Sequence, residues 1–179
     1  MKAFKETDRI ILREIELSDA PAMFEMDSDP EVHKYLGKQP IQTINETIEN
    51  IEYIRQQYLD HGIGRWAVED KHLNQFVGWS GLKFRPDEVN GYVNYVEVGY
   101  RFLKRFWGKG YATESAIQSI DYAFEELKLN CVYAMANKDN SGSRNTLLKA
   151  GLKNTGQFNY ENIDCDWFEI TLEDWQKKV

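Results

Sequence analysis

Apolar residues recur at helical spacing in a long segment of the first third of the chain. The segment opens on Thr43-Ile44-Asn45-Glu46, a capping box in which the Thr43 hydroxyl and the Glu46 carboxylate satisfy each other's neighbouring N–H groups. It closes at His61-Gly62, a typical helix end. The pattern predicts one helix with one apolar face. That face consists of Ile44, Ile48, Ile51, Ile54 and Tyr58.

Other helices are indicated by the same spacing and by capping residues. We expect a helix over Ala20 to Met26 capped by Ser18-Asp19, a short helical turn after Asp29-Pro30, and a helix that stops at Gly151. A further long helix is expected to run to about Leu127. Its apolar stripe, which suits packing on a sheet, consists of Ala112, Ala116, Ile120, Ala123, Phe124 and Leu127.

Strands are predicted where β-branched and aromatic residues run between polar turns. The run Cys131 to Ala136 is continuously apolar, so we expect a strand buried on both faces, with Cys131 in the core rather than acting as a covalent relay. The other expected strands are Arg9–Arg13, Arg65–Glu69, Phe76–Phe84, Asn94–Leu103, Leu152–Phe158 and Asp166–Leu172. This order predicts an α+β fold with three layers around one mixed sheet, in a single domain over residues 1–179.

Composition and charge narrow the class of protein. A net charge of -7 argues against a general nucleic-acid or anionic-membrane surface. No apolar run approaches the roughly 18 residues of a membrane span, and the first residues lack the apolar region of a secretory signal, so we expect a cytoplasmic protein. Cys131 and Cys165 form neither a disulfide framework nor a zinc spacing. The three His residues have no metal-ligand spacing, so no metal is expected.

A glycine-containing turn between the strand that ends at Leu103 and the following helix carries the first chemical signal. Free backbone N–H groups and the positive end of a helix dipole meet at such a turn and bind phosphate. The P-loop pattern fails because Tyr111 follows Gly110, and the dinucleotide fingerprint fails because Thr113 stands where a small third residue is needed. The stretch reads Arg105-Phe106-Trp107-Gly108-Lys109-Gly110-Tyr111-Ala112-Thr113.

This stretch resembles the R-x-x-G-x-G-x-A/T loop of the GNAT superfamily of acetyl-CoA-dependent N-acetyltransferases. Asn140-Ser141-Gly142-Ser143 with the following Leu147 to Leu152 resembles a second element of that family, and Glu97 to Leu103 is similar to a strand of its ribosomal-protein N-terminal acetyltransferase-like (RimJ/RimL-like) branch. The resemblance covers nearly the whole chain and implies a GNAT-like three-layer α/β/α fold with a mostly antiparallel central sheet.

The resemblance also implies a coenzyme A site. In the family the glycine loop wraps the pyrophosphate, the Asn holds the pantetheine arm, and backbone groups near Phe102 and Leu103 contact the thioester. The cofactor-binding residues expected on this basis are Phe102, Leu103, Arg105, Trp107, Gly108, Lys109, Gly110, Tyr111, Ala112, Thr113 and Asn140. The cofactor is acetyl-CoA as co-substrate, without a metal.

Acetyl transfer to an amine that is mostly protonated at neutral pH is helped by a general base. Glu97 is the candidate, because it precedes the loop on the strand beside which the acetyl group lies in the family; a salt-bridged strand carboxylate is the alternative interpretation. Many family members carry a Tyr seven residues after the Asn to protonate the thiolate, but here that residue is Leu147. Ser143, Thr146 or water would replace it, and Ser143 is our prediction.

The acceptor is left open between several classes. A primary amine such as a protein N-terminus is the first hypothesis, and a polyamine, amino acid or aminoglycoside is the second. The acidic balance favours a cationic acceptor, which carboxylates such as Asp60, Glu69, Asp87 and Glu88 could attract. A non-catalytic acyl-CoA-binding module is the third hypothesis. The protein is expected to be a monomer or homodimer.

Overall fold

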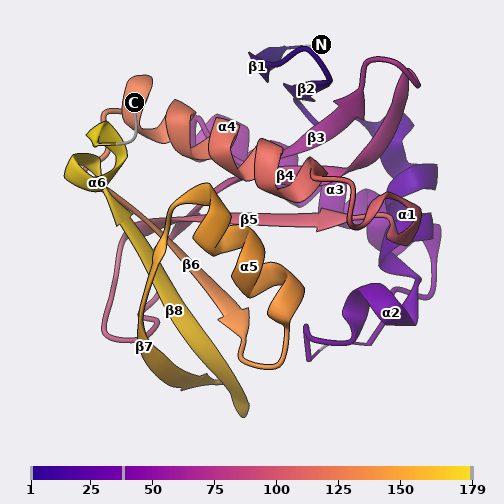
Figure 1. The fold of residues 1–179 in the computed structure, drawn as a ribbon. Coiled ribbons are helices and arrows are strands. Elements are labelled where there is room, and N and C mark those ends of the chain that lie inside the picture. The colour runs from indigo at the N-terminus through magenta and orange to yellow at the C-terminus, as the bar shows by residue number, and fades with distance from the viewer. Residues whose placement is uncertain (1, 38, 178–179) are drawn as a thin grey trace.

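The computed structural model describes residues 2–37 and 39–177 of the chain, which form one mixed sheet with helices on both faces (Figure 1). The strands are β1 (Ala3–Glu6), β2 (Ile10–Arg13), β3 (Arg65–Asp70), β4 (Gln75–Arg85), β5 (Tyr95–Phe102), β6 (Cys131–Asn137), β7 (Lys153–Tyr160) and β8 (Ile163–Thr171). The helices are α1 (Ala20–Asp27), α2 (Pro30–His33), α3 (Ile44–His61), α4 (Tyr111–Glu125), α5 (Ser141–Ala150) and α6 (Leu172–Gln176).

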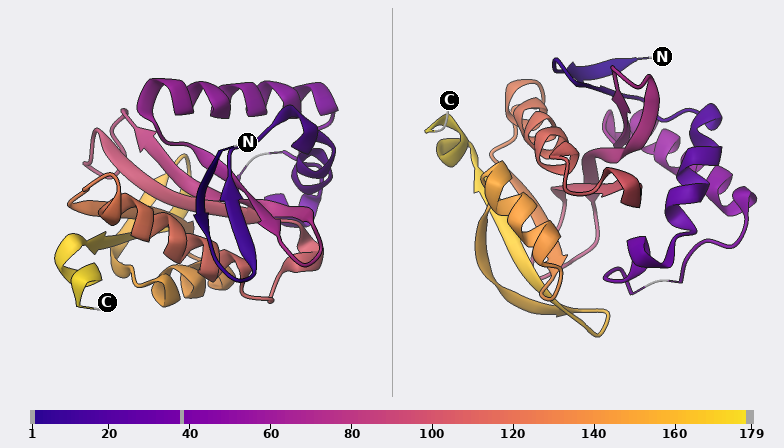
Figure 2. Two further views of the ribbon diagram at one scale, coloured as in Figure 1. Left: turned by 90° about the horizontal axis from the view of Figure 1, so that it is seen from above. Right: turned by 45° about the vertical axis from the view of Figure 1, so that its right-hand side comes forward.

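The strand order is β1-β2-β3-β4-β5-β6-β8-β7, and every neighbouring pair is antiparallel except β5 and β6, which are parallel. The last strand therefore inserts between β6 and β7. Helices α3 and α4 lie on opposite sides of the sheet, as the view from above shows (Figure 2). The predicted α+β fold with three layers and a mostly antiparallel sheet is confirmed.

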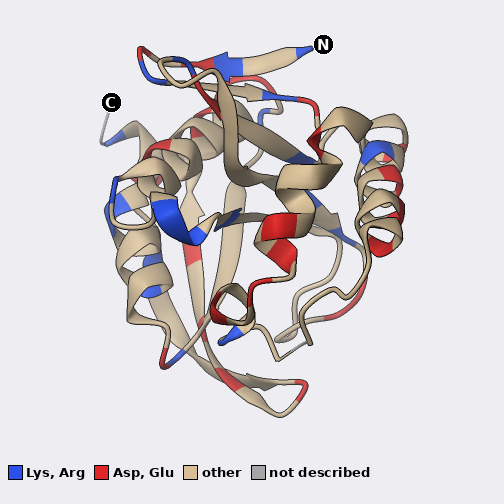
Figure 3. Cartoon of the chain, turned by 90° about the vertical axis from the view of Figure 1, so that its right-hand side faces the viewer, with Lys and Arg blue, Asp and Glu red and all other residues tan. Residues whose placement is uncertain are grey.

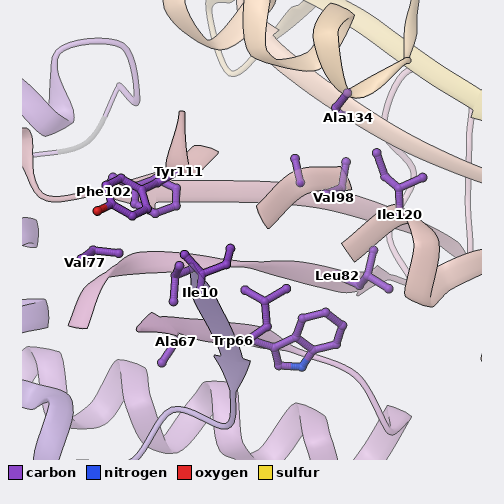
Figure 4. Close-up of a cluster of buried hydrophobic side chains, with 14 of the residues drawn as sticks. Ile10, Trp66, Ala67, Val77, Leu82, Val98, Phe102, Tyr111, Ile120 and Ala134 are labelled. Carbon is purple, nitrogen blue, oxygen red and sulfur yellow. The ribbon is translucent and has the colours of Figure 1, made fainter. Parts of the chain in front are cut away.

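The core fills the space between the sheet and the helices. Side chains from β2, β3, β4, β5 and α4 converge there, and Ile10, Trp66 and Leu82 are fully buried (Figure 4). The predicted face of α3 is confirmed at Ile51, which is fully buried, whereas Ile44 is 41% exposed because it stands in the first turn. The predicted capping box at Thr43 and the left-handed Gly62 that ends α3 are both present.

Four features of the fold differ from the sequence prediction. Strand β1 and helix α6 were not predicted, since both are short. Asp19 does not cap α1 with its side chain; instead it holds Arg13 in a buried two-point ion pair at 2.8 Å and accepts from the Glu16 N–H. Strand β6 is fully buried on alternate residues only. Its second face packs against an aromatic cluster around Trp167 and is half-buried, and Cys131 is half-buried instead of lying in the core.

Candidate active site

A cavity of about 830 Å³ opens where strands β5 and β6 separate. The two parallel strands are paired at Glu97 and Tyr133, and beyond this point they diverge toward their carboxyl ends. Val98 to Phe102 of β5 and Met135 to Asn137 of β6 line the opening. Parallel strands are usually held by a continuous ladder, so this interruption exposes backbone groups in the middle of the sheet.

Backbone amides of β5 point into the opening at alternate residues. The Leu103 N–H donates to the Val77 carbonyl of the β4 side at 3.1 Å. Because N–H groups alternate in direction along a strand, those of Phe102 and Tyr100 face the opposite side, toward β6. The Phe102 carbonyl accepts a hydrogen bond from the Trp107 indole N–H at 2.8 Å. Of the two predicted backbone contacts, Phe102 therefore faces the cavity, and Leu103 lies outside its lining.

The glycine turn at the end of β5 brings the start of α4 to the cavity. Gly108 and Gly110 have φ of 72° and 87°, a left-handed backbone that L side chains rarely adopt. Gly110 is the N-cap of α4, and its carbonyl accepts the first helical bond, from Glu114. The preceding amides, Tyr111 to Thr113, have no partner within the helix. These amides and the positive end of the α4 dipole suit an anion.

The predicted residues of this loop are divided by the structure. Trp107, Gly108, Gly110, Tyr111, Ala112 and Thr113 line the cavity. Arg105 and Lys109 lie outside the lining: Arg105 pairs with Glu25 of α1, and the Lys109 ammonium lies 5.3 Å from the Phe106 ring. Tyr111 is 6% exposed and donates to Asp70 at 2.6 Å, so its side chain serves the core. Over the side drawn in Figure 3, basic and acidic residues are interspersed.

Helix α5 presents Asn140 and Ser143 to the same cavity. The Asn140 side-chain oxygen caps the helix by accepting from the Ser143 N–H at 3.0 Å. Its amide nitrogen is then the group left to face a ligand. Leu147 is buried and lines the cavity below them.

Tyr100 is a residue that the motif comparison did not select. Its hydroxyl lies 3.0 Å from the Ser143 carbonyl oxygen and 3.1 Å from the Ser143 Oγ. Burial raises the pKa of Tyr100 to about 12, against the opposing effect of hydrogen bonds with Ser143 and Thr146, so the phenol stays protonated at neutral pH. Strand alternation could have identified it, because Tyr100 shares a face with the apolar Val98 and Phe102.

Glu97 is an ion-paired carboxylate on the opposite face of β5. Its Oε1 accepts from Arg65 Nη2 at 2.7 Å, and its Oε2 lies 4.0 Å from Arg85 Nε. Burial lowers the pKa of the Arg65 guanidinium, and the Glu97 charge opposes that shift. Among the described residues no hydrogen-bond donor lies on Oε2, so this oxygen is available to a ligand. The ion pair matches the alternative interpretation given for Glu97, and its catalytic role stays a prediction.

Two glycines allow Arg65 to reach Glu97 across the sheet. Arg65 pairs with Gly81 of β4, and Gly81 pairs with Gly99 of β5, so the side chain crosses a strip without side chains. The guanidinium also donates to the Gly81 carbonyl at 2.6 Å. A Cβ on Gly99 would lie 2.8 Å from Arg65 Nη2.

We therefore expect Gly99→Ala to push Arg65 away from Glu97 and to lower the free energy of unfolding by about 2 kcal/mol, since it disturbs a buried ion pair. Urea denaturation measures this change. Gly142→Ala is the control, because its backbone is not left-handed and the nearest atom to a Cβ placed there, Asn140 Oδ1, lies at an ordinary contact distance of 3.6 Å. An equal loss in both variants would show that the passage of the Arg65 side chain over Gly99 does not contribute to the free energy of unfolding.

The far end of the cavity is closed by aromatic and apolar groups. Trp79 lies between two guanidiniums, 5.4 Å from Arg65 and 5.2 Å from Arg101, and Arg101 is paired with Asp27 at 2.6 Å. The segment after α2 meets the turn between β7 and β8, where a Cβ on Gly37 would lie 2.3 Å from Ile163 Cδ1. Residues far apart in the chain therefore form this end, which explains why no motif predicted it.

Neither a cluster of metal ligands nor a membrane-spanning helix occurs among the described residues. No three His, Cys, Asp or Glu side chains lie together as a metal ion would require within residues 2–37 and 39–177. In the same part of the chain, none of the helices has the length and apolar character needed to cross a membrane.

Comparison with known proteins gives consistent results. The family model for the acetyltransferase (GNAT) domain matches residues 9–153. The chain is 31% identical over 160 residues to the uncharacterized N-acetyltransferase YoaA of Bacillus subtilis (strain 168), a match that covers 88% of each chain.

Two solved complexes with coenzyme A share the fold at low identity. Spermidine N-acetyltransferase from Vibrio cholerae, solved with CoA and spermine, has a TM-score of 0.76 at 20% identity, covering 95% of this chain and 99% of that one. RimL, a ribosomal L7/L12 alpha-N-protein acetyltransferase solved with coenzyme A, has a TM-score of 0.80 at 14% identity, covering 97% and 99%. One fold thus serves enzymes with different acceptors.

Proposed function

Since the chain belongs to the GNAT acetyltransferase family and is an acetyl-CoA-dependent N-acetyltransferase, we propose that it acetylates a primary amine that enters at the Glu97 end of the cavity. A protein N-terminal amine is the acceptor we favour. The similarity of Glu97 to Leu103 to the RimJ/RimL-like strand supports this choice. One observation carries the proposal: unpaired amides of β5, the start of α4 and the open Glu97 oxygen all face one cavity.

The residues present fit coenzyme A. The amides of Tyr111 to Thr113 and the left-handed Gly108 and Gly110 would hold the pyrophosphate. The Phe102 and Tyr100 amides and the Asn140 side chain would hold the pantetheine arm, because a bound amide chain needs donors of this kind in a buried groove. Acetyl-CoA supplies the acetyl group as a thioester.

Glu97 would accept the proton that the amine must lose. Its Oε2 is the available oxygen, since Oε1 is held by Arg65. The Arg65 ion pair fixes the rotamer of the carboxylate, which keeps Oε2 directed at the cavity. As the new C–N bond forms and the C–S bond breaks, the amine proton passes to Oε2, directly or through a water.

The leaving thiolate is stabilised at the other face of β5, where Tyr100 and Ser143 meet. When the Tyr100 phenol donates to the Ser143 carbonyl oxygen, the Ser143 hydroxyl hydrogen is left to donate into the cavity. Ser143 is therefore the proposed hydrogen-bond donor to the thiolate, which takes its final proton from water, and Tyr100 is the residue that positions Ser143. Because a thiol titrates near pH 8.5, this help is modest.

We expect Ser143→Ala to lower kcat about tenfold, with coenzyme A affinity retained; this is below the roughly 100-fold or more of a typical proton-transfer group, because the thiolate leaves readily without help. Tyr100→Phe should give a similar loss, and the double variant should be no worse than either single one, since both act through one hydroxyl. Steady-state kinetics and calorimetry measure these quantities. Tyr53→Phe on the exposed side of α3 is the control. Additive losses would contradict a shared role.

The proposed function is tested with the purified full chain, acetyl-CoA and a panel of peptides and small amines. Release of free thiol and the mass of each product are recorded. A small amine is the second candidate, because an enzyme with the same fold acts on spermidine. Preference for peptide N-termini supports the first choice, preference for a small amine supports the second, and no transfer to any amine would overturn both.

A further inference from the structure

The charges at the acceptor end of the cavity are unbalanced. Glu97 is the one carboxylate among three buried charged groups, and its neighbours Arg65 and Arg85 are both cationic. The side chains of Arg65, Arg85 and Glu97 are 11%, 17% and 11% exposed. Water screens such groups weakly, so a net positive potential persists at this end of the cavity.

Among the described residues that line the cavity, no second buried carboxylate compensates for this charge. Among the described residues the cavity is lined by two acidic side chains, Glu97 and Glu31, and the exposed Glu31 lies 3.8 Å from Lys104. Two carboxylates considered as attractants of a cationic acceptor are occupied elsewhere: Glu69 pairs with Arg13 at 2.8 Å, and Asp60 accepts from Gln56 on α3. A second ammonium group on the acceptor would therefore enter without a counterion.

Tyr160 offers a donor toward the cavity at the same place. It stands at the end of β7, lines the cavity, and accepts a hydrogen bond from Arg85 Nη2 at 3.1 Å. A phenol that accepts from a guanidinium keeps its own hydrogen to donate. Because the guanidinium polarises the phenol, this donor suits an anion better than a neutral acceptor.

We propose that the acceptor carries a carboxylate a few bonds from its primary amine, and that the Tyr160 hydroxyl, supported by Arg85 and Arg65, receives that carboxylate. This inference rests on the proposed function. The amine then lies at the Glu97 Oε2 while the acid group lies toward β7. Free amino acids and peptides with acidic first residues share this chemistry, and diamines and aminoglycosides lack it.

Three compounds of equal chain length test the charge preference. 4-Aminobutyrate, n-butylamine and 1,4-diaminobutane share a primary amine on four carbons and differ at the other end. With the full chain and acetyl-CoA, we expect kcat/KM to fall at least about tenfold from the first to the second and about 100-fold from the first to the third, since the second differs from the first by one unit of charge and the third by two, each worth about tenfold. Equal or higher kcat/KM for the diamine would overturn the inference and leave the proposed function standing.

A second readout does not require turnover. Binding of the same three compounds to the protein saturated with coenzyme A is followed by calorimetry. Tighter binding of 4-aminobutyrate supports the inference, whereas equal or weaker binding of 4-aminobutyrate contradicts it. Failure of every amine to be acetylated, whatever its binding, would count against the proposed function instead. Amidated Asp-Ala and free aspartate then distinguish a peptide acceptor from a free amino acid.

Tyr160→Phe removes the hydroxyl group that is the proposed donor and leaves the rest of the side chain unchanged. We expect the preference for 4-aminobutyrate over n-butylamine to fall several-fold in this variant. Arg85→Gln should reduce it further, because it removes the charge that polarises the phenol. Lys177→Gln, at the residue that follows α6, removes an exposed cation paired with Glu173 and should leave the ratio unchanged. An unchanged ratio in both cavity variants would overturn the assignment of Tyr160.

Discussion

Gly110→Val weakens coenzyme A binding by at least about 100-fold. At φ of 87° a β-branched residue is strained, so the turn before α4 should rearrange. The amides of Tyr111 to Thr113 would then lose their common direction. Each hydrogen bond from an amide to a charged phosphate contributes about 1.5–3 kcal/mol, and two such losses exceed the 2.7 kcal/mol or so that 100-fold represents. Calorimetric titration with coenzyme A measures the change.

Gly62→Val is the matched control for that experiment. Gly62 ends α3 at φ of 69°, and no atom lies within 4 Å of a Cβ placed there, so the variant carries the same kind of backbone strain away from the cavity. Both variants should lose stability by roughly 1–2 kcal/mol in urea denaturation. Only Gly110→Val should lose the ligand. Retained affinity in that variant would remove the start of α4 from the coenzyme site.

Glu97→Gln is expected to lower kcat/KM by about 100-fold or more at neutral pH, the usual effect of losing a general base. The amide keeps an oxygen for Arg65 but cannot take a proton from the amine. The loss should shrink as pH rises toward the pKa of the amine, about 8 for the N-terminal amine of a peptide and about 10 for an aliphatic amine, because more of the amine is then already deprotonated. A pH profile of the variant against the parent protein therefore reports the role of Glu97 directly.

Glu69→Gln separates that role from stability. Glu69 is likewise a strand carboxylate paired with an arginine, Arg13, at 2.8 Å, but it lies outside the cavity lining. Each substitution removes one carboxylate partner from a largely buried guanidinium, so both should lower the melting temperature, and Glu69→Gln should lower it less because Asp19 still pairs with Arg13. Only Glu97→Gln should change the pH profile. If the parent and Glu97→Gln profiles coincide, Glu97 is a structural ion-pair partner and the proton leaves by another route.

The fold was predictable from local patterns because most elements carry their own signals. The capping box at Thr43, the stripe on α4 and the glycine at residue 151 each depend on a few neighbouring residues. Where an outcome depended on a distant partner, the prediction was wrong. Asp19 is of a residue type that commonly caps helices, but its carboxylate is bound by the Arg13 guanidinium on β2 instead. Cys131 lies in an apolar run, yet its burial depends on what covers β6.

The residues of the candidate site likewise fall into those that a local motif identifies and those that depend on distant parts of the chain. Gly108, Gly110 and Asn140 belong to short motifs, so the sequence alone predicted them as binding residues. All three line the cavity. Arg65 and Tyr160 belong to none. Arg65 acquires its place from the register that aligns Gly81 with Gly99, and Tyr160 from its contact with Arg85 of β4, 75 residues earlier in the chain. Such positions follow from strand pairing over long sequence separations, which a local pattern does not encode.

The strand order also sets when the site can become complete during synthesis. Strand β7 precedes β8 in the chain but lies outside it, so β6 gains its antiparallel neighbour only after residues 163–171 have emerged from the ribosome. The coenzyme motifs are all translated by Ser143, yet the wall of the cavity formed by β6 is unsupported on one edge until then. A nascent chain therefore holds the proposed catalytic residues well before the sheet that positions them is complete.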